Sequence, residues 1–128
     1  MNERRSTSSS NASSSPPPAA ILQPRDYLIL LGLAGGRCHG YGLIKEIAHM
    51  SDDGVRMDPA NLHRALQRLV RDGLVRDLGR LPKAEERRRY YEITDRGMAR
   101  ARGEARRLER LSAVARARLA AGEPKGAS

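Results

Sequence analysis

Residues 58–74 read DPANLHRALQRLVRDGL, and this stretch predicts a helix whose two ends and buried face are all marked in the sequence. Asp58 is a common capping residue, Pro59 suits the first helical position because its φ angle is already fixed, and Gly73 supplies a stop. Between these ends, apolar residues recur at helical spacing along one side: Leu62, Ala65, Leu66 and Leu69. The opposite side carries Ala60, Asn61, Arg64, Gln67, Arg68 and Arg71. We therefore expect an amphipathic helix over residues 59–72 with a basic outer face.

Two more helices are expected upstream of this stretch. Residues 26–34 read DYLILLGLA, which is apolar on nearly every side and is typical of a helix in the core, ended by Gly35 and Gly36. Residues 39–50 read HGYGLIKEIAHM and place four apolar side chains at helical spacing: Leu43, Ile44, Ile47 and Met50. The polar residues 51–57 then predict a loop that leads into the basic helix.

Two short strands are expected downstream. Residues 74–78 (LVRDL) and 89–94 (RYYEIT) favour strand because of their β-branched, aromatic and leucine content. Residues 79–88 between them are polar and basic and contain Pro82, so the pair predicts a β-hairpin. Three helices followed by a hairpin is the order of a winged helix-turn-helix domain. The expected fold class is mainly α with a small β-hairpin, the wing, followed by one long C-terminal helix.

The long last helix is expected after Thr94, which suits a capping position. Its small and apolar residues recur at alternating steps of three and four, which describes a narrow seam rather than a broad core face. Arginines fill most of the remaining circumference, so the helix cannot be wholly buried. We therefore predict a coiled-coil-like contact between two copies of the chain, a homodimer, along the seam formed by Met98, Ala101, Ala105, Leu108, Ser112, Ala115 and Leu119.

The composition narrows the choice of partner. The chain of 128 residues carries 24 Lys and Arg against 15 Asp and Glu, a formal charge of +9, which favours a phosphate-rich partner. An arginine-rich source proteome would produce part of the same excess. The single cysteine, Cys38, allows neither an intrachain disulfide nor a cysteine-based zinc cluster, so we expect no metal and no cofactor. Without an apolar signal segment or a stretch long enough to span a membrane, the protein is expected to be cytoplasmic.

The outer face of the basic helix supplies candidate contacts to double-stranded DNA. Amide side chains can pair with adenine edges, and guanidinium groups can grip guanine or phosphate. The candidates on this face are Asn61, Arg64, Gln67 and Arg68. Any surface helix also turns polar residues outward, so the face alone leaves simple solvation as an alternative.

The hairpin loop adds a second group of candidates. In a flexible loop, consecutive arginines could all reach a phosphate backbone or a minor groove, and this loop holds Arg87, Arg88 and Arg89. A solvated charge run is the other interpretation. The organisation that follows is a disordered Ser/Pro-rich arm at 1–20, a winged-helix DNA-binding domain at 21–94, a dimerisation helix at 95–121 and a flexible tail at 122–128.

Four motifs in order, from about Leu22 to Gly97, carry a family resemblance. They read YLILLGLAGG, HGYGLIKEI, DPANLHRALQRLVRDGLV and RRRYYEITDRG. In this order they resemble the PadR family of transcriptional regulators. The resemblance implies a winged-helix repressor that binds a palindromic operator as a homodimer through a C-terminal helical region. It also implies that Tyr41 lies by the DNA backbone, with the groove faced by Asn61, His63, Arg64 and Gln67.

Some features stay open at this stage. Tyr41 could equally be a core ring with its hydroxyl at the rim. The third helix of the family usually begins with Gly and Thr and carries Tyr, whereas this chain has Ala60, Asn61 and His63, so the operator sequence is not transferable. Inducer-like ligands are known for only some members, and the short segment after the wing puts a small-molecule inducer pocket in doubt.

Two other classes of function compete with a DNA-binding regulator. For an enzyme the sequence offers little: its histidines, His39, His49 and His63, stand far apart, and no HExxH, CxxC or glycine-rich phosphate loop is present. Cys38 beside His39 lacks an evident orienting carboxylate, so an idle thiol is predicted, with a redox switch as the alternative. The rival function is a winged-helix protein-protein interaction module, whose binding should depend weakly on salt.

Overall fold

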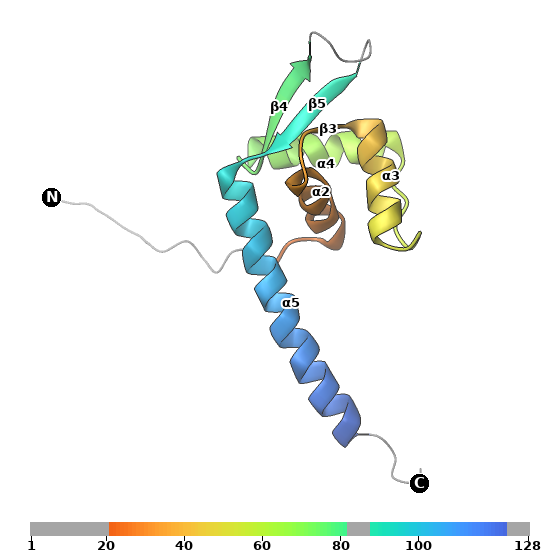
Figure 1. The fold of residues 1–128 in the computed structure, drawn as a ribbon, viewed down its shortest axis with the longest axis vertical. Coiled ribbons are helices and arrows are strands. Elements are labelled where there is room, and N and C mark those ends of the chain that lie inside the picture. Colours follow the sequence, from red (N-terminus) through yellow and green to blue (C-terminus); the bar gives the residue numbers. More distant parts are fainter. Residues whose placement is uncertain (1–20, 82–87, 123–128) are drawn as a thin grey trace, which may run out of the picture.

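The computed structural model describes residues 21–81 and 88–122, and these form four helices and a small three-stranded sheet (Figure 1). The order is α2 (Pro24–Ala34), β3 (Cys38–His39), α3 (Gly40–Met50), α4 (Pro59–Arg71), β4 (Val75–Arg80), β5 (Arg89–Ile93) and α5 (Asp95–Ala121). Three helices, a hairpin and a long helix follow one another as expected. The predicted fold class, a winged helix-turn-helix with a long C-terminal helix, is confirmed.

The helix ends follow the capping residues. Asp58 accepts a hydrogen bond from the backbone N–H of Asn61 at 2.8 Å, and Pro59 occupies the first turn of α4. Thr94 caps α5 in the same way, because its hydroxyl accepts from the N–H of Gly97 at 3.0 Å. The same hydroxyl donates to the carbonyl of Gly73 at 2.7 Å, so one side chain ties the end of the hairpin to the turn after α4.

The sheet contains one strand that the sequence pattern did not predict. Its order is β3-β5-β4, all antiparallel, with β5 in the centre. The additional strand, β3, pairs Cys38 with Tyr91 and His39 with Tyr90. Two residues are too few to show the alternation that marks a strand, so its edge position depends on tertiary pairing.

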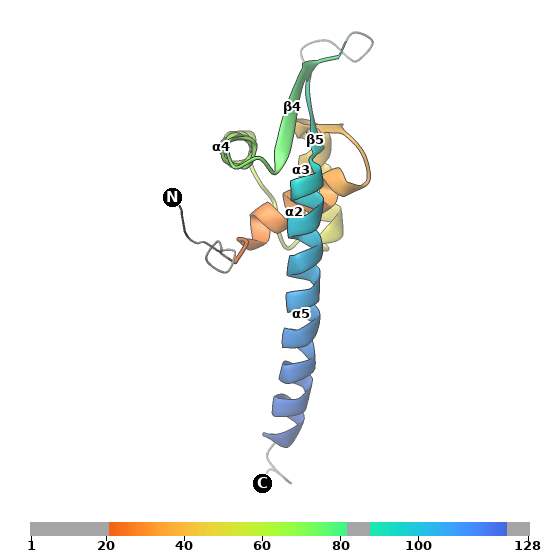
Figure 2. The same cartoon turned by 90° about the vertical axis from the view of Figure 1, so that its left-hand side faces the viewer.

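The core surrounds α2, which packs against α3, α4, α5 and β5. Its largest fully buried members are Ile29, Leu30 and Leu33 of α2, Leu43 and Ile47 of α3, and Leu66 and Leu69 of α4. Seen along its axis, α4 lies to one side of the hairpin, with α2 and α3 packed below them (Figure 2). The buried face of α4 therefore points inward, and its opposite face is left at the surface.

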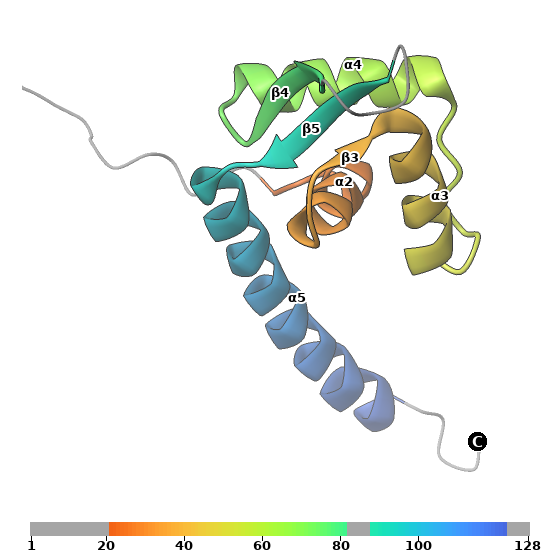
Figure 3. The same cartoon turned by 45° about the horizontal axis from the view of Figure 1, so that its top comes forward.

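The last helix, α5, leaves the domain after its first turns. Its buried residues are Gly97, Ala101 and Glu104, and every described residue from Leu108 onward is exposed. The helix extends well beyond the other elements (Figures 1 and 3). Among the described residues, none of the helices combines the length and the apolar character needed to cross a membrane.

The crossing of α5 over the hairpin gives a stability prediction. A Cβ at Gly97 would lie 2.2 Å from the carbonyl oxygen of Leu74, which is backbone and cannot easily move. Gly97→Ala should therefore lower the free energy of unfolding by about 1–3 kcal/mol. Gly103→Ala is the matched control in the same helix, because the nearest atom to its Cβ is 3.9 Å away, at the tip of Arg106.

Without a clash, Gly103→Ala should raise stability by about 0.5–1 kcal/mol through helix propensity. Urea titrations followed by circular dichroism measure both changes. Equal stability of Gly97→Ala and the wild type would show that α5 does not approach the Leu74 carbonyl this closely.

Candidate nucleic-acid interface

The outward face of α4 is polar and exposed. His63, Arg64 and Gln67 lie on the side opposite Leu62, Ala65, Leu66 and Leu69, and Arg71 continues this face toward the C-terminal end of the helix. Their side chains can donate or accept hydrogen bonds without desolvating a core group. Arg71 extends the set of candidate contacts, since it follows Arg64 by two helical turns.

Asn61 is partly committed to the start of its own helix. Its side-chain amide donates to the Asp58 carboxylate at 2.8 Å, and its side-chain oxygen accepts from Arg64. Asp58, Asn61 and Arg64 thus form a short chain of hydrogen bonds along the first turns of α4. A partner that uses Asn61 must exchange at least one of these bonds.

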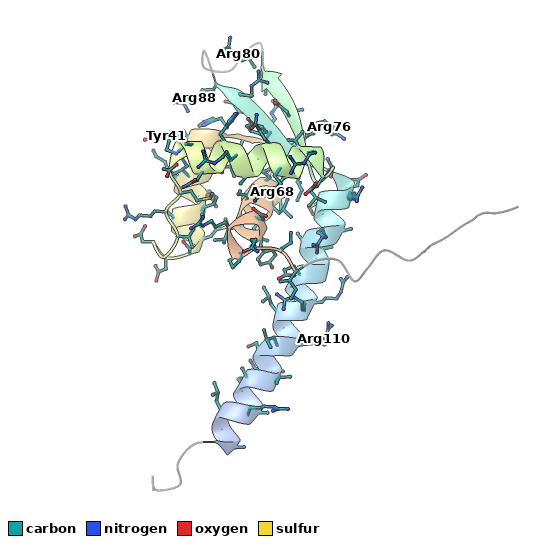
Figure 4. All side chains as sticks on the ribbon, turned by 180° about the vertical axis from the view of Figure 1, so that it is seen from behind. Tyr41, Arg68, Arg76, Arg80, Arg88 and Arg110 are labelled. Atoms are coloured by element: carbon teal, nitrogen blue, oxygen red, sulfur yellow. The ribbon has the colours of Figure 1, made fainter. Side chains whose placement is uncertain are left out.

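Arg68 differs from the other predicted contacts, because it is tied to the body of the domain. Its guanidinium donates to the carboxylate of Asp26 on α2 at 2.7 Å. The side chain of Asp26 is only 9% exposed, whereas the side chain of Arg68 is 43% exposed. Figure 4 shows Arg68 on the side of α4 that faces α2. This ion pair joins α2 to α4 through two residues that are 42 positions apart in sequence.

Tyr41 lies on the surface at the start of α3, not in the core. Its residue is 58% exposed, and two cationic groups face its ring: the Lys45 Nζ at 4.7 Å and the Arg88 Cζ at 5.7 Å from the ring centroid. Both distances are within the range of a cation–π contact. A hydroxyl, an ammonium and a guanidinium therefore gather at one place beside the N-terminal end of α3 (Figure 4). Lys45 is therefore a further candidate for DNA contact, which its charge alone did not distinguish from other surface lysines and arginines.

His39 connects the start of α3 to the wing. Its Nδ1 accepts from the N–H of Gly42 at 3.0 Å and caps α3, while the Nη1 of Arg88 lies 2.8 Å from its Nε2. The ring also meets Tyr90 edge-on, with centroids 5.3 Å apart. These contacts hold Arg88 beside Tyr41. His39 therefore has a structural role at the junction of α3 and the wing.

The neighbouring arginines of the wing have different surroundings. Arg89 lies in β5 and pairs with Asp77 of β4, with N–O distances of 3.0 and 3.1 Å. This ion pair raises the pKa of Arg89 and holds its side chain across the hairpin. Arg87 lies outside the described residues. Of the two arginines in this run that the structure describes, Arg88 is the one next to Tyr41.

Two hollows flank α4. One, of about 280 Å³, lies between α4, the start of α3 and β5, and its walls include Ile44, Leu62, Leu66 and Tyr91. The other, of about 550 Å³, lies between α4 and the N-terminal end of α2 and has Arg25, Asp26, Arg64 and Arg68 in its walls. The two hollows are not predicted by the periodicity of residues 59–72 or by the charge count. The shape of each hollow depends on how α2 and β5 approach α4.

The predicted dimer seam on α5 is divided between two environments. Ala101 is buried in the chain's own core, and Met98 is half-buried. Exposed residues follow: Ala105, Leu108, Ser112, Ala115 and Leu119. The exposed apolar residues of α5 also include Leu111 and Val114. Leu111 follows Leu108 by three positions, a spacing that places both on one side of the helix. The predicted seam instead continues from Leu108 by four positions to Ser112, and for this reason it does not include Leu111.

The comparisons with known proteins identify the family. The model of the transcriptional regulator PadR-like family matches residues 29–103, which is more than half of the chain. The chain belongs to this family. The match spans the domain from α2 to the first turns of α5 and confirms the resemblance inferred from the four motifs.

Solved structures agree with the PadR-like fold. A transcriptional regulator from Clostridium thermocellum is 29% identical, with a TM-score of 0.59, and the match covers 70% of this chain and 84% of that one. A PadR-like regulator from Bacillus cereus is 19% identical, with a TM-score of 0.64, covering 74% and 90%. Bacillus subtilis PadR, solved in complex with operator DNA, is 17% identical, with a TM-score of 0.56, covering 63% and 46%. Among curated proteins, none has a sequence that matches this chain.

Cys38 gives a prediction about reactivity in this PadR-like protein. Burial raises the pKa of the Cys38 thiol, the backbone hydrogen bond at His39 lowers it by less, and the Glu46 carboxylate raises it further. A raised pKa leaves less thiolate near neutral pH, and the thiolate is the reactive form. Alkylation by iodoacetamide should therefore be slower in the folded protein than in the urea-unfolded chain, and the gap should narrow as pH rises. Faster alkylation of the folded protein would instead indicate an activated thiol.

Proposed function

We propose that this PadR-like regulator is a sequence-specific DNA-binding repressor that binds a palindromic operator as a homodimer. The observation that carries the proposal is the exposed polar face of α4. Beside this face lies a cluster of three side chains, in which the cations of Lys45 and Arg88 face the ring of Tyr41. The Bacillus subtilis PadR complex with operator DNA supports the choice of partner, since that protein shares this fold. A small-molecule inducer stays a prediction of the family resemblance.

The geometry of a duplex suits this assignment. The major groove of B-DNA is about 12 Å wide, and an α-helix with its side chains is about 10–12 Å across, so α4 fits with its polar face toward the base edges. Arg64 can then donate to guanine and Gln67 can pair with adenine. Tyr41, Lys45 and Arg88 would meet the sugar-phosphate backbone beside the groove, where contacts fix position and carry no sequence information.

A two-fold dimer would make the operator palindromic, because each copy of α4 reads an equivalent half-site. The exposed apolar residues of α5 support this part of the proposal. Leu108 and Leu111 lie on the continuation of the side that packs against the domain through Ala101. An apolar stripe of this kind on an extended helix is stabilised by burial against a second copy.

The base-reading role of α4 is tested with Arg64→Ala. Duplexes selected by the wild type from a random pool should lose about 1–3 kcal/mol of binding free energy, because a bidentate contact to a base is removed, whereas random duplexes should lose little. Gel-shift titrations measure both. Arg88→Ala is the comparison: as a backbone contact it should weaken both kinds of duplex alike.

Equal losses on selected and random duplexes for Arg64→Ala would reject base readout by this residue. Binding that is insensitive to salt would reject the DNA-binding proposal itself and would favour the protein-interaction module. Each neutralised phosphate contributes a slope of about −0.9 in a plot of log affinity against log salt.

The dimer is tested on α5. Leu108→Glu places a charge in the apolar stripe, so the molecular mass measured by light scattering should fall toward that of a monomer. Ala113→Glu is the matched control: it adds the same charge to the exposed part of the same helix, on a different side from Leu108. An unchanged mass for Leu108→Glu would place the interface elsewhere.

A further inference from the structure

The larger hollow beside α4 is lined by Arg64, the proposed base-reading residue, and by two further arginines, Arg25 and Arg68, to which the proposed complex above assigns no contact. It lies between one flank of α4 and the N-terminal end of α2 and has a volume of about 550 Å³. Its charged residues are Arg25, Asp26, Arg64 and Arg68. Three guanidinium groups therefore share the hollow with one carboxylate, which leaves an excess of positive charge. A hollow with this balance suits an anion.

The two arginines nearest the α2 side differ in how they are held. Arg68 donates one N–H to Asp26 at 2.7 Å, and a guanidinium has five N–H donors, so most of its donors stay available. Asp26 is buried and thereby holds the Arg68 side chain in one direction. Arg25 is exposed, and it forms no ion pair with any acidic residue in the part of the chain that the structure describes.

The backbone of α2 adds donors at the same place. This helix has 11 residues, and its capping residue, Gln23, makes no side-chain hydrogen bond to the first turn. The first N–H groups of a helix have no partner within the helix and point toward the positive end of its dipole. Because Pro24 has no backbone N–H, the donors here are the N–H groups of Arg25 and Asp26, which would complement the guanidiniums of Arg25 and Arg68 in binding a negative charge.

The position of the hollow indicates which anion it holds. In the proposed complex α4 lies in the major groove, which is bounded by a phosphate backbone on each side. Tyr41, Lys45 and Arg88 stand at one flank of α4, next to the wing, and the lining residues of the hollow place it at the other flank, next to α2. Figure 4 shows Tyr41 and Arg88 apart from Arg68, which lines the hollow. We propose that the hollow binds a DNA backbone phosphate through Arg25 and Arg68. This inference rests on the proposed function and adds a second backbone contact to it.

The test uses Arg25→Ala, because Arg25 has no ion pair in the described residues whose loss could unfold the protein. The probe is a labelled random-sequence duplex several helical turns long, titrated by fluorescence anisotropy between roughly 50 and 200 mM salt. Arg25→Ala should weaken binding at low salt and flatten the salt slope by about 0.9 for each bound protomer. Arg25→Lys, which keeps the charge, should restore most of the slope.

The matched control is Arg110→Ala, which removes the same charge from an exposed site far along α5 (Figure 4). Light scattering first establishes that both variants keep the wild-type mass. A control slope equal to that of the wild type, with a flatter slope for Arg25→Ala, supports the second backbone contact. Equal slopes for Arg25→Ala, the control and the wild type would overturn it. A wild type without salt-dependent binding would instead reject the proposed function.

Discussion

The burial of one side of α4 is the constraint on which the rest of the structure depends. Leu62, Leu66 and Leu69 are almost completely buried against α2 and α3, and each such side chain contributes about 1.5–3 kcal/mol. Turning the helix by one residue would expose leucines and bury arginines without partners, at a cost of several kcal/mol. The ion pair between Arg68 and Asp26 fixes the same rotation from the side. The polar face of α4 therefore points outward, because the apolar face is buried only when it packs against α2 and α3.

The sequence predicts the elements around α4 well where a cap and a periodic face coincide. Asp58 and Thr94 both act as caps in the structure, because a short oxygen-bearing side chain before a helix satisfies a free N–H. The pattern fails at Cys38–His39, where a two-residue strand exists only because β5 offers it an edge. The start of α2 at Pro24 also precedes the expected Asp26, since the apolar run that suggested the helix begins after its first turn.

The candidate site is less predictable, because its members are defined by partners that are distant in the chain. For Arg64 and Gln67, the helical spacing is enough to predict that the side chains lie at the surface. Arg68 has the same spacing but pairs with Asp26, which a local pattern cannot reveal. Arg88 and Arg89 are neighbours in sequence, yet Arg88, just before β5, contacts His39 of β3, whereas Arg89, the first residue of β5, pairs with Asp77 of β4. A count of charges treats all these arginines as equivalent, whereas in the folded protein each arginine has different neighbours.

One helix, α5, links the domain to the proposed partner copy. Its first turns pack through Ala101 and through Glu104, which is 5% exposed and bonds Arg107 one turn later. These contacts fix the direction in which the exposed part, with Leu108 and Leu111, leaves the domain. In the proposed dimer, the rigid continuity of one helix would therefore set the separation of the two α4 helices. Since half-sites of such dimers lie about 34–36 Å apart, the register of the α5 contact would decide which operator spacing can be bound.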